Sequence, residues 1–183
     1  MRRTFVPAAA FLIAAYGVVG VAAELKSGLQ LGTVPGAFYV QDCTGPKKGQ
    51  FLCYRCRYAG RPVVSIFARN IDKNLTDLIK RVDAKVAKNK DLKMAAFLVL
   101  LTDDPDVVEP KLVALAKKHK IKHVPLTIFD GSIGPPKYQI AEEADVTVMM
   151  WSNTVKANRA FAKGKLDKKA VKKIAADTGK ILK

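Results

Sequence analysis

Two cysteines spaced two residues apart form the part of this sequence best suited to chemistry. Cys53 and Cys56 lie in "LCYRCRYAGRPVV", among arginines and tyrosines and just before an apolar run typical of a buried strand. A Cys-x-x-Cys pair closes a small disulfide whose reactivity depends on how well its surroundings stabilise a thiolate. The pattern fits a redox pair, a structural disulfide or half of a metal site, and spacing alone leaves all three open.

Positive charge flanks both cysteines. Arg55 and Arg57, with Arg61 nearby, are expected to favour a thiolate electrostatically, so Arg55 and Arg57 join the cysteines as candidate catalytic residues. Such charge favours thiol-disulfide exchange over a static bridge.

Roles within the pair follow from the usual behaviour of this motif. Cys53 is the expected attacking thiol and Cys56 the resolving thiol, because the N-terminal sulfur is usually the more exposed. Tyr54 and Tyr58 are expected to form an apolar rim for a docking thiol or peptide. Static alternatives are a structural Cys53–Cys56 bridge or two inert thiols that stiffen a loop.

The third cysteine, Cys43, has no evident partner. Three cysteines are an odd number, so at least one thiol has no partner within the chain. Closeness makes Cys53 and Cys56 the natural pair, although spacing also permits Cys43 to bond to either. Cys43 is interpreted as a third resolving thiol or as a packed strand residue.

A zinc site is the weaker alternative. The two histidines, His119 and His123, precede a strand expected to run parallel to the strand that follows Cys56. Two cysteines and two histidines suit zinc, but an oxidising compartment disfavours thiolate ligands. Arg57 stands where c-type haem attachment needs a histidine. No metal or other cofactor is therefore expected.

The N-terminal segment is typical of an export signal. Two arginines precede an apolar run rich in small residues, which ends in "VAA" before Glu24. Residues 1–23 are predicted to be a cleaved signal peptide, with an uncleaved membrane anchor as the alternative. Residues 24–183 would then form one domain in the periplasm or outside the cell, with no membrane span after cleavage.

The chain is strongly basic, with a formal net charge of +16. Positive charge can indicate nucleic acid, an anionic surface or an acidic protein as partner. The lysines are not interleaved with stacking aromatic residues, so nucleic acid is not expected. The expected partners are a protein thiol or disulfide and an acidic protein or anionic surface.

Strands and helices alternate along residues 24–183. The alternation predicts an α/β sandwich of three layers, with a mainly parallel sheet, helices on both faces and an antiparallel far edge. Strand 62–68 is expected between strand 94–101 and the hairpin. The expected elements are a short strand within 37–46, a strand at 62–68, a helix at 74–88, a strand at 94–101, a helix at 108–119, a strand within 123–130, a hairpin at 146–161 and a helix beginning near Leu166.

The order of these elements resembles the thioredoxin-like superfamily, in particular its redoxin and peroxiredoxin-like branch. Three stretches carry the resemblance: "LGTVPGAFYVQDCTG", "YAGRPVVSIFA" and "VTVMMWSNTVKANRAFAKGKLDKKAVKKI". It implies a central mixed sheet that ends in an antiparallel hairpin and a helix. It also implies thiol-disulfide or peroxide chemistry at a cysteine just after the first central strand.

The usual active-site positions of that family do not match. No cysteine occurs in residues 68–74, and Asp145-Val146 stands where active members carry a cis-proline. The Cys-x-x-Cys pair instead precedes strand 62–68, at the opposite end of the sheet. The sequence therefore predicts an exported thiol-disulfide oxidoreductase with a displaced site, or a redox-inactive binding module with a structural disulfide.

Overall fold

A computed structural model describes residues 25–182 of the chain. The predicted signal segment at residues 1–23 lies outside this range. Within residues 25–182, no helix is long and apolar enough to cross a membrane. The elements are β1 (Val40–Asp42), β2 (Phe51–Leu52), α1 (Tyr54–Tyr58), β3 (Val63–Ala68), α2 (Lys73–Lys88), β4 (Ala95–Thr102), α3 (Pro105–His119), β5 (Leu126–Asp130), η1 (Pro136–Tyr138), β6 (Ala144–Ser152), β7 (Thr154–Ala162), α4 (Lys168–Asp177) and η2 (Thr178–Ile181).

The sheet has seven strands in the order β2-β1-β5-β4-β3-β6-β7. Strand β3 lies between β4 and β6, which confirms the expected place of strand 62–68 beside 94–101 and the hairpin. The expectation of a mainly parallel sheet is wrong. Only β3–β4 and β4–β5 are parallel, because the N-terminal strands and the closing hairpin pair antiparallel at the two edges.

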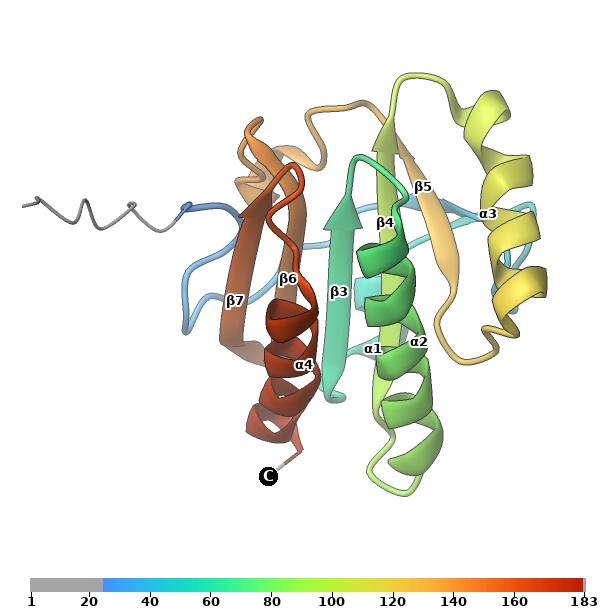
Figure 1. Cartoon of the computed structure of the whole chain (residues 1–183). Coiled ribbons are helices and arrows are strands. Elements are labelled where there is room, and N and C mark those ends of the chain that lie inside the picture. The colour runs from blue at the N-terminus through green and yellow to red at the C-terminus, as the bar shows by residue number, and fades with distance from the viewer. Residues whose placement is uncertain (1–24, 183) are drawn as a thin grey trace, which may run out of the picture.

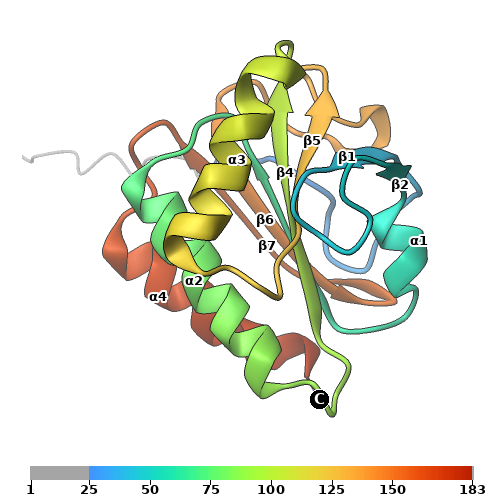
Figure 2. The same cartoon turned by 90° about the vertical axis from the view of Figure 1, so that its right-hand side faces the viewer.

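The three long helices α2, α3 and α4 cover one face of the sheet (Figures 1 and 2). The expectation of helices on both faces therefore fails for the long helices. From β3 to β4 to β5 the chain steps in one direction, and two right-handed crossovers in the same direction place both helices on the same face. The opposite face carries α1, η1 and the segment before β1.

Each face has its own core. Alternating side chains of β3 send Val64 and Ile66 toward the long helices, and Val63 and Phe67 toward the face that carries α1. The second core is rich in aromatic rings, from Phe38, Tyr54, Tyr58, Phe67, Phe97, Tyr138 and Trp151. The cysteine motif therefore lies against an aromatic core.

Candidate functional site

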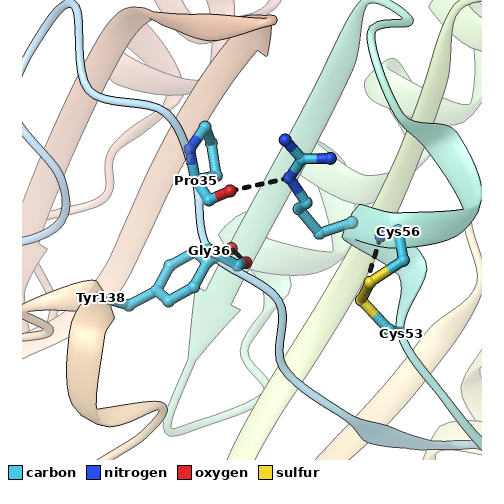
Figure 3. Close-up of a disulfide and its surroundings, with 6 residues drawn as sticks. Pro35, Gly36, Cys53, Cys56 and Tyr138 are labelled. Atoms are coloured by element: carbon cyan, nitrogen blue, oxygen red, sulfur yellow. Dashed lines mark hydrogen bonds between the residues drawn. A yellow bond between two sulfur atoms is a disulfide. The ribbon is translucent and has the colours of Figure 1, made fainter.

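The Cys53–Cys56 pair is a disulfide on the short helix α1 (Figure 3). The S–S distance is 2.07 Å and the Cα atoms lie 5.2 Å apart. Cys53 is the N-cap of α1, and its Sγ accepts a hydrogen bond from the backbone N–H of Cys56 at 3.0 Å. A hydrogen bond donated to sulfur stabilises the thiolate form when the disulfide opens.

The two cysteines differ in exposure, in the opposite sense to the expectation. Cys53 is buried, with 8% of its surface exposed, whereas Cys56 is exposed. The expectation that the N-terminal cysteine is the more exposed is therefore wrong. The N-cap position turns Cys53 inward, while Cys56 lies on the outer side of the single helical turn.

Tyr54 and Tyr58 do not form the expected exposed apolar rim, although Tyr58 lines a neighbouring cleft with its small remaining surface. Both side chains are buried, and their rings lie 5.3 Å apart, with Phe97 stacked 5.4 Å from Tyr54. The expectation failed because a five-residue helix gives no periodicity from which its buried face can be predicted. These tyrosines instead anchor α1 to the aromatic core.

A buried carboxylate fixes the position of α1. Asp42 is fully buried and accepts a hydrogen bond from the Tyr54 hydroxyl at 2.8 Å. Backbone N–H groups of Thr44, Gly45 and Lys47 donate to the same carboxylate at 3.2, 2.6 and 2.8 Å. This network satisfies the buried charge and joins α1 to the turn that follows β1.

Arg55 and Arg57 differ in their contacts. The half-buried Arg55 donates a hydrogen bond from Nε to the carbonyl of Pro35 at 2.7 Å (Figure 3). The neighbouring carbonyl of Gly36 accepts a hydrogen bond from the Tyr138 hydroxyl at 2.7 Å. Arg57 is exposed and directly follows the exposed cysteine. Arg55 therefore ties α1 to the N-terminal segment, and Arg57 leaves a positive charge at the surface. Their effect on the cysteines stays a prediction.

The stretch at residues 68–74, where the redoxin resemblance implies a cysteine, instead carries a structural contact. Arg69 follows the carboxyl end of β3, and its guanidinium donates to the carbonyls of Ala144 at 3.0 Å, Ala141 at 3.1 Å and Ser132. Sequence reasoning missed this residue, and its one signal was an arginine directly after a buried strand. Strand β3 spans six residues, so Arg69 lies about 20 Å from the amino end that follows α1.

Cys43 is a buried free thiol. It is fully buried in the core beneath the long helices. Burial, with smaller effects of Glu109 and Asp42, raises the pKa of the Cys43 thiol to about 12. The thiol is therefore protonated at neutral pH, which supports the packing interpretation over that of a resolving thiol.

The structure does not assemble the zinc site. Cys53 and Cys56 are disulfide-bonded, and residues 25–182 contain no group of three or more histidine, cysteine or acidic side chains placed to hold a metal ion. His119 ends α3, whereas His123 lies in the segment leading into β5. The two histidines therefore do not complete a site with the cysteine pair.

Comparison with known proteins establishes the fold. No family model and no curated protein matches the sequence. Among solved structures, a candidate protein disulfide isomerase from Bacteroides thetaiotaomicron matches with a TM-score of 0.63 and 13% identity over 86% of this chain and 94% of the other. A thiol-disulfide oxidoreductase from Bacteroides fragilis matches with a TM-score of 0.52 and 18% identity over 78% of this chain and 99% of the other.

A peroxidoxin, BcpB from Mycobacterium tuberculosis, matches with a TM-score of 0.55 and 15% identity over 82% of this chain and 96% of the other. Likeness at these identities is a likeness of fold. The seven-stranded mixed sheet, the closing hairpin and the last helix are the parts that the redoxin resemblance implied. The chain is therefore a protein of the thioredoxin-like fold, and its structural neighbours include thiol-disulfide oxidoreductases and a peroxidoxin.

Proposed function

We propose that this protein is an exported thiol-disulfide oxidoreductase that acts through the Cys53–Cys56 disulfide. One observation carries the proposal: an exposed cysteine is bonded to a buried one whose sulfur already accepts a backbone hydrogen bond. One sulfur is thus accessible to a partner, and the other is prepared to leave as a thiolate. The fold it shares with thiol-disulfide oxidoreductases agrees with this role.

The exchange begins at the exposed sulfur. A partner thiolate attacks Cys56 Sγ, a mixed disulfide forms, and the Cys53–Cys56 bond breaks with its electron pair left on Cys53 Sγ. The Cys56 N–H stabilises that thiolate. A second thiolate of the partner then attacks the partner sulfur that is bonded to Cys56, which forms a disulfide within the partner and releases Cys56 as a thiolate. The partner is oxidised by two electrons and the pair is reduced, and the reverse sequence reduces a partner disulfide.

Arg57 and Arg55 have different parts in this proposal. Arg57, exposed beside Cys56, attracts an incoming thiolate. Arg55 acts through position, because its bond to Pro35 holds the turn on which both cysteines sit. Cys56 replaces Cys53 as the point of attack in this proposal because of its exposure.

The alternative is a redox-inactive binding module with a structural disulfide. The observation in its favour is the anchoring of α1, since a bridge on a helix tied to the core by Tyr54 and Asp42 also serves as a brace. Peroxidase activity receives less support, because residues 68–74 hold no cysteine and Arg69 fills that place with backbone contacts.

The reduction potential separates these functions. The purified protein, in a Cys43→Ala background, is equilibrated with glutathione mixtures, trapped with a thiol reagent and weighed by mass spectrometry. A potential above about −230 mV supports the oxidoreductase, whereas one below about −300 mV favours a structural bridge.

Single-cysteine variants, made in the same Cys43→Ala background, test the order of attack. Cys53→Ser leaves the exposed Cys56, and Cys56→Ser leaves the buried Cys53. The Cys53→Ser protein is expected to attack a labelled peptide disulfide and form a mixed disulfide faster, with release of the other peptide thiol, and a faster Cys56→Ser protein would reverse the order. N-terminal sequencing of the protein from a cell-envelope fraction tests export, with Glu24 as the expected first residue.

A further inference from the structure

A basic cleft adjoins α1, and Arg57, the residue after Cys56, is one of its lining residues. Its volume is about 440 Å³, and it lies between the end of α1 with the residues after it and the segment leading into β5. Figure 2 shows α1 beside the turn that follows β1, which contributes the third wall. The side chains that give the cleft its character are those of Arg57, Tyr58, Arg61, Lys122 and His123.

The surface of the cleft carries basic side chains with no facing carboxylate. No aspartate or glutamate lines it. Arg57 and Arg61 take part in none of the ion pairs formed within residues 25–182. A second cavity of about 270 Å³ shares Tyr58, Arg61 and His123 and adds Lys90. The positive charge therefore faces a ligand-sized space.

One wall of the cleft is formed by an arginine that lies over a tyrosine ring. The Arg61 guanidinium carbon lies 5.2 Å from the centroid of the Tyr58 ring, and its Nε donates to the Lys93 carbonyl at 2.6 Å. These two contacts leave the terminal nitrogens of Arg61 for a ligand. A guanidinium presents its nitrogens in a planar fork, which binds carboxylates with two parallel hydrogen bonds.

The facing wall is held by a carboxylate behind it. Asp83 Oδ1, from α2, accepts hydrogen bonds from the backbone N–H groups of Lys122, His123 and Val124 at 3.0, 2.6 and 3.0 Å. Three bonds to one oxygen fix the backbone of this segment. The cleft is therefore formed before a ligand arrives, which lowers the entropic cost of binding.

We propose that the cleft binds the carboxylates of a small anionic thiol or disulfide and thereby presents its sulfur to Cys56. This inference rests on the proposed function. A volume of about 440 Å³ lies within the range of small-molecule sites. Arg57 adjoins Cys56 in the chain, so a carboxylate bound by Arg57 places a sulfur a few bonds away beside the reacting disulfide. The small thiolate attacks Cys56 Sγ and the electron pair of the broken bond goes to Cys53 Sγ. A second molecule of the small thiol then attacks the sulfur of the first, which releases Cys56 as a thiolate and forms a small-molecule disulfide.

Three thiols of different charge test the proposal. Mercaptosuccinate carries two carboxylates, 2-mercaptoethanol is neutral and cysteamine is cationic. The rate at which each reduces the Cys53–Cys56 disulfide is measured for the natural protein and for Arg57→Gln with Arg61→Gln. The ratio of the two rates cancels the intrinsic reactivity of each thiol. The control is Lys168→Gln with Lys169→Gln, which removes two exposed charges from α4 on the other face.

The expected result is a selective loss. Each arginine substitution should lower the rate at which mercaptosuccinate reduces the disulfide about two- to fivefold, the size of effect measured for charge pairs near a protein surface. The rate of reduction by 2-mercaptoethanol should change by less than about twofold. Cysteamine should react at the same rate or faster, and the control should change none of the three. The proposal would be overturned if the arginine substitutions changed the reduction rate by the same factor for all three thiols. It would also be overturned if the lysine control slowed mercaptosuccinate as much as the arginine substitutions do. Arg57→Gln alone gives the same test without disturbing the Arg61 stack.

Binding without chemistry separates this inference from the proposed function. The Cys53→Ser/Cys56→Ser protein is titrated with succinate and followed by backbone amide NMR. Shifts confined to residues 44–45, 57–61 and 121–125 support the cleft as an anion site. They would do so even if the natural disulfide proved inert to every thiol, a result that would refute the oxidoreductase alone. No shift in these segments at tens of millimolar succinate would overturn the cleft as an anion site.

Discussion

Two tyrosines of α1 provide a matched test of how the disulfide is positioned. Tyr54 and Tyr58 are both buried against Phe97, but only the Tyr54 hydroxyl has a hydrogen-bond partner within residues 25–182. That partner, Asp42, is a fully buried carboxylate. Tyr54→Phe removes one donor from a buried charge, whereas Tyr58→Phe removes a hydroxyl that binds no described residue.

The magnitude follows from the partner. A hydrogen bond to a charged group contributes about 1.5–3 kcal/mol, and Asp42 Oδ2 keeps only the N–H of Lys47 when the Tyr54 hydroxyl is lost. Tyr54→Phe should lower the free energy of unfolding by about 2 kcal/mol, or Tm by roughly 4–8 °C for a domain of this size. Tyr58→Phe should stay within about 0.5 kcal/mol.

Urea denaturation with the disulfide intact measures both variants. Burial and the bond to Asp42 raise the pKa of Tyr54 and burial raises that of Tyr58 to about 12, so both hydroxyls stay protonated at neutral pH. Equal losses for the two variants, or a loss below about 0.5 kcal/mol for Tyr54→Phe, would refute the idea that Asp42 anchors α1.

Three further outcomes are expected. Arg69→Ala should lower the free energy of unfolding in urea denaturation by about 2–4 kcal/mol. Arg69→Lys should recover only part of this loss, because an ammonium lacks the planar fork of a guanidinium. An unchanged free energy of unfolding would mean that the contacts of Arg69 with the carbonyls are dispensable. Burial raises the pKa of Asp177, but hydrogen bonds from two basic side chains, with Arg159 at 2.5 Å, outweigh it and lower the pKa below its usual 3.8. The Asp177 carboxylate therefore contributes fully to the free energy of unfolding above pH 3.8, and this contribution is lost as the pH falls through the lowered pKa. In acid unfolding below about pH 4, the difference in the free energy of unfolding between the natural protein and Asp177→Asn should therefore become smaller. Cys53→Ser with Cys56→Ser should cost about 2 kcal/mol, the loop-closure entropy of a four-residue loop, and a much larger loss in thermal unfolding would indicate a structural brace.

The central strands and the hairpin were predictable because their signals are local. Short apolar runs predict β3, which is rich in β-branched residues, and β4, since both strands are buried on their two faces. The hairpin turn holds Asn153 at a φ of 66°, a conformation that asparagine tolerates well. The face that α2 and α3 cover was also within reach, because it follows from crossover handedness and the order of strands.

The site was less predictable because its features depend on distant residues. Helix α1 is a single turn, so no periodicity shows that Tyr54 faces the core. The three-carbonyl contact of Arg69 depends on a loop more than 60 residues away. The cleft combines Arg57 and Arg61 with Lys122 because β3 and β5 run parallel on either side of β4, so their amino ends lie at the same edge of the sheet.

The burial of sulfur in this fold has a consequence for oxidative damage. Cys43 is a protonated, fully buried thiol, and the other two cysteines are already joined. Met94, Met149 and Met150 are buried as well. The resting protein therefore offers hydrogen peroxide no thiolate to convert to sulfenic or sulfinic acid and no exposed thioether within residues 25–182. It becomes sensitive only during the interval in which Cys53 and Cys56 are reduced.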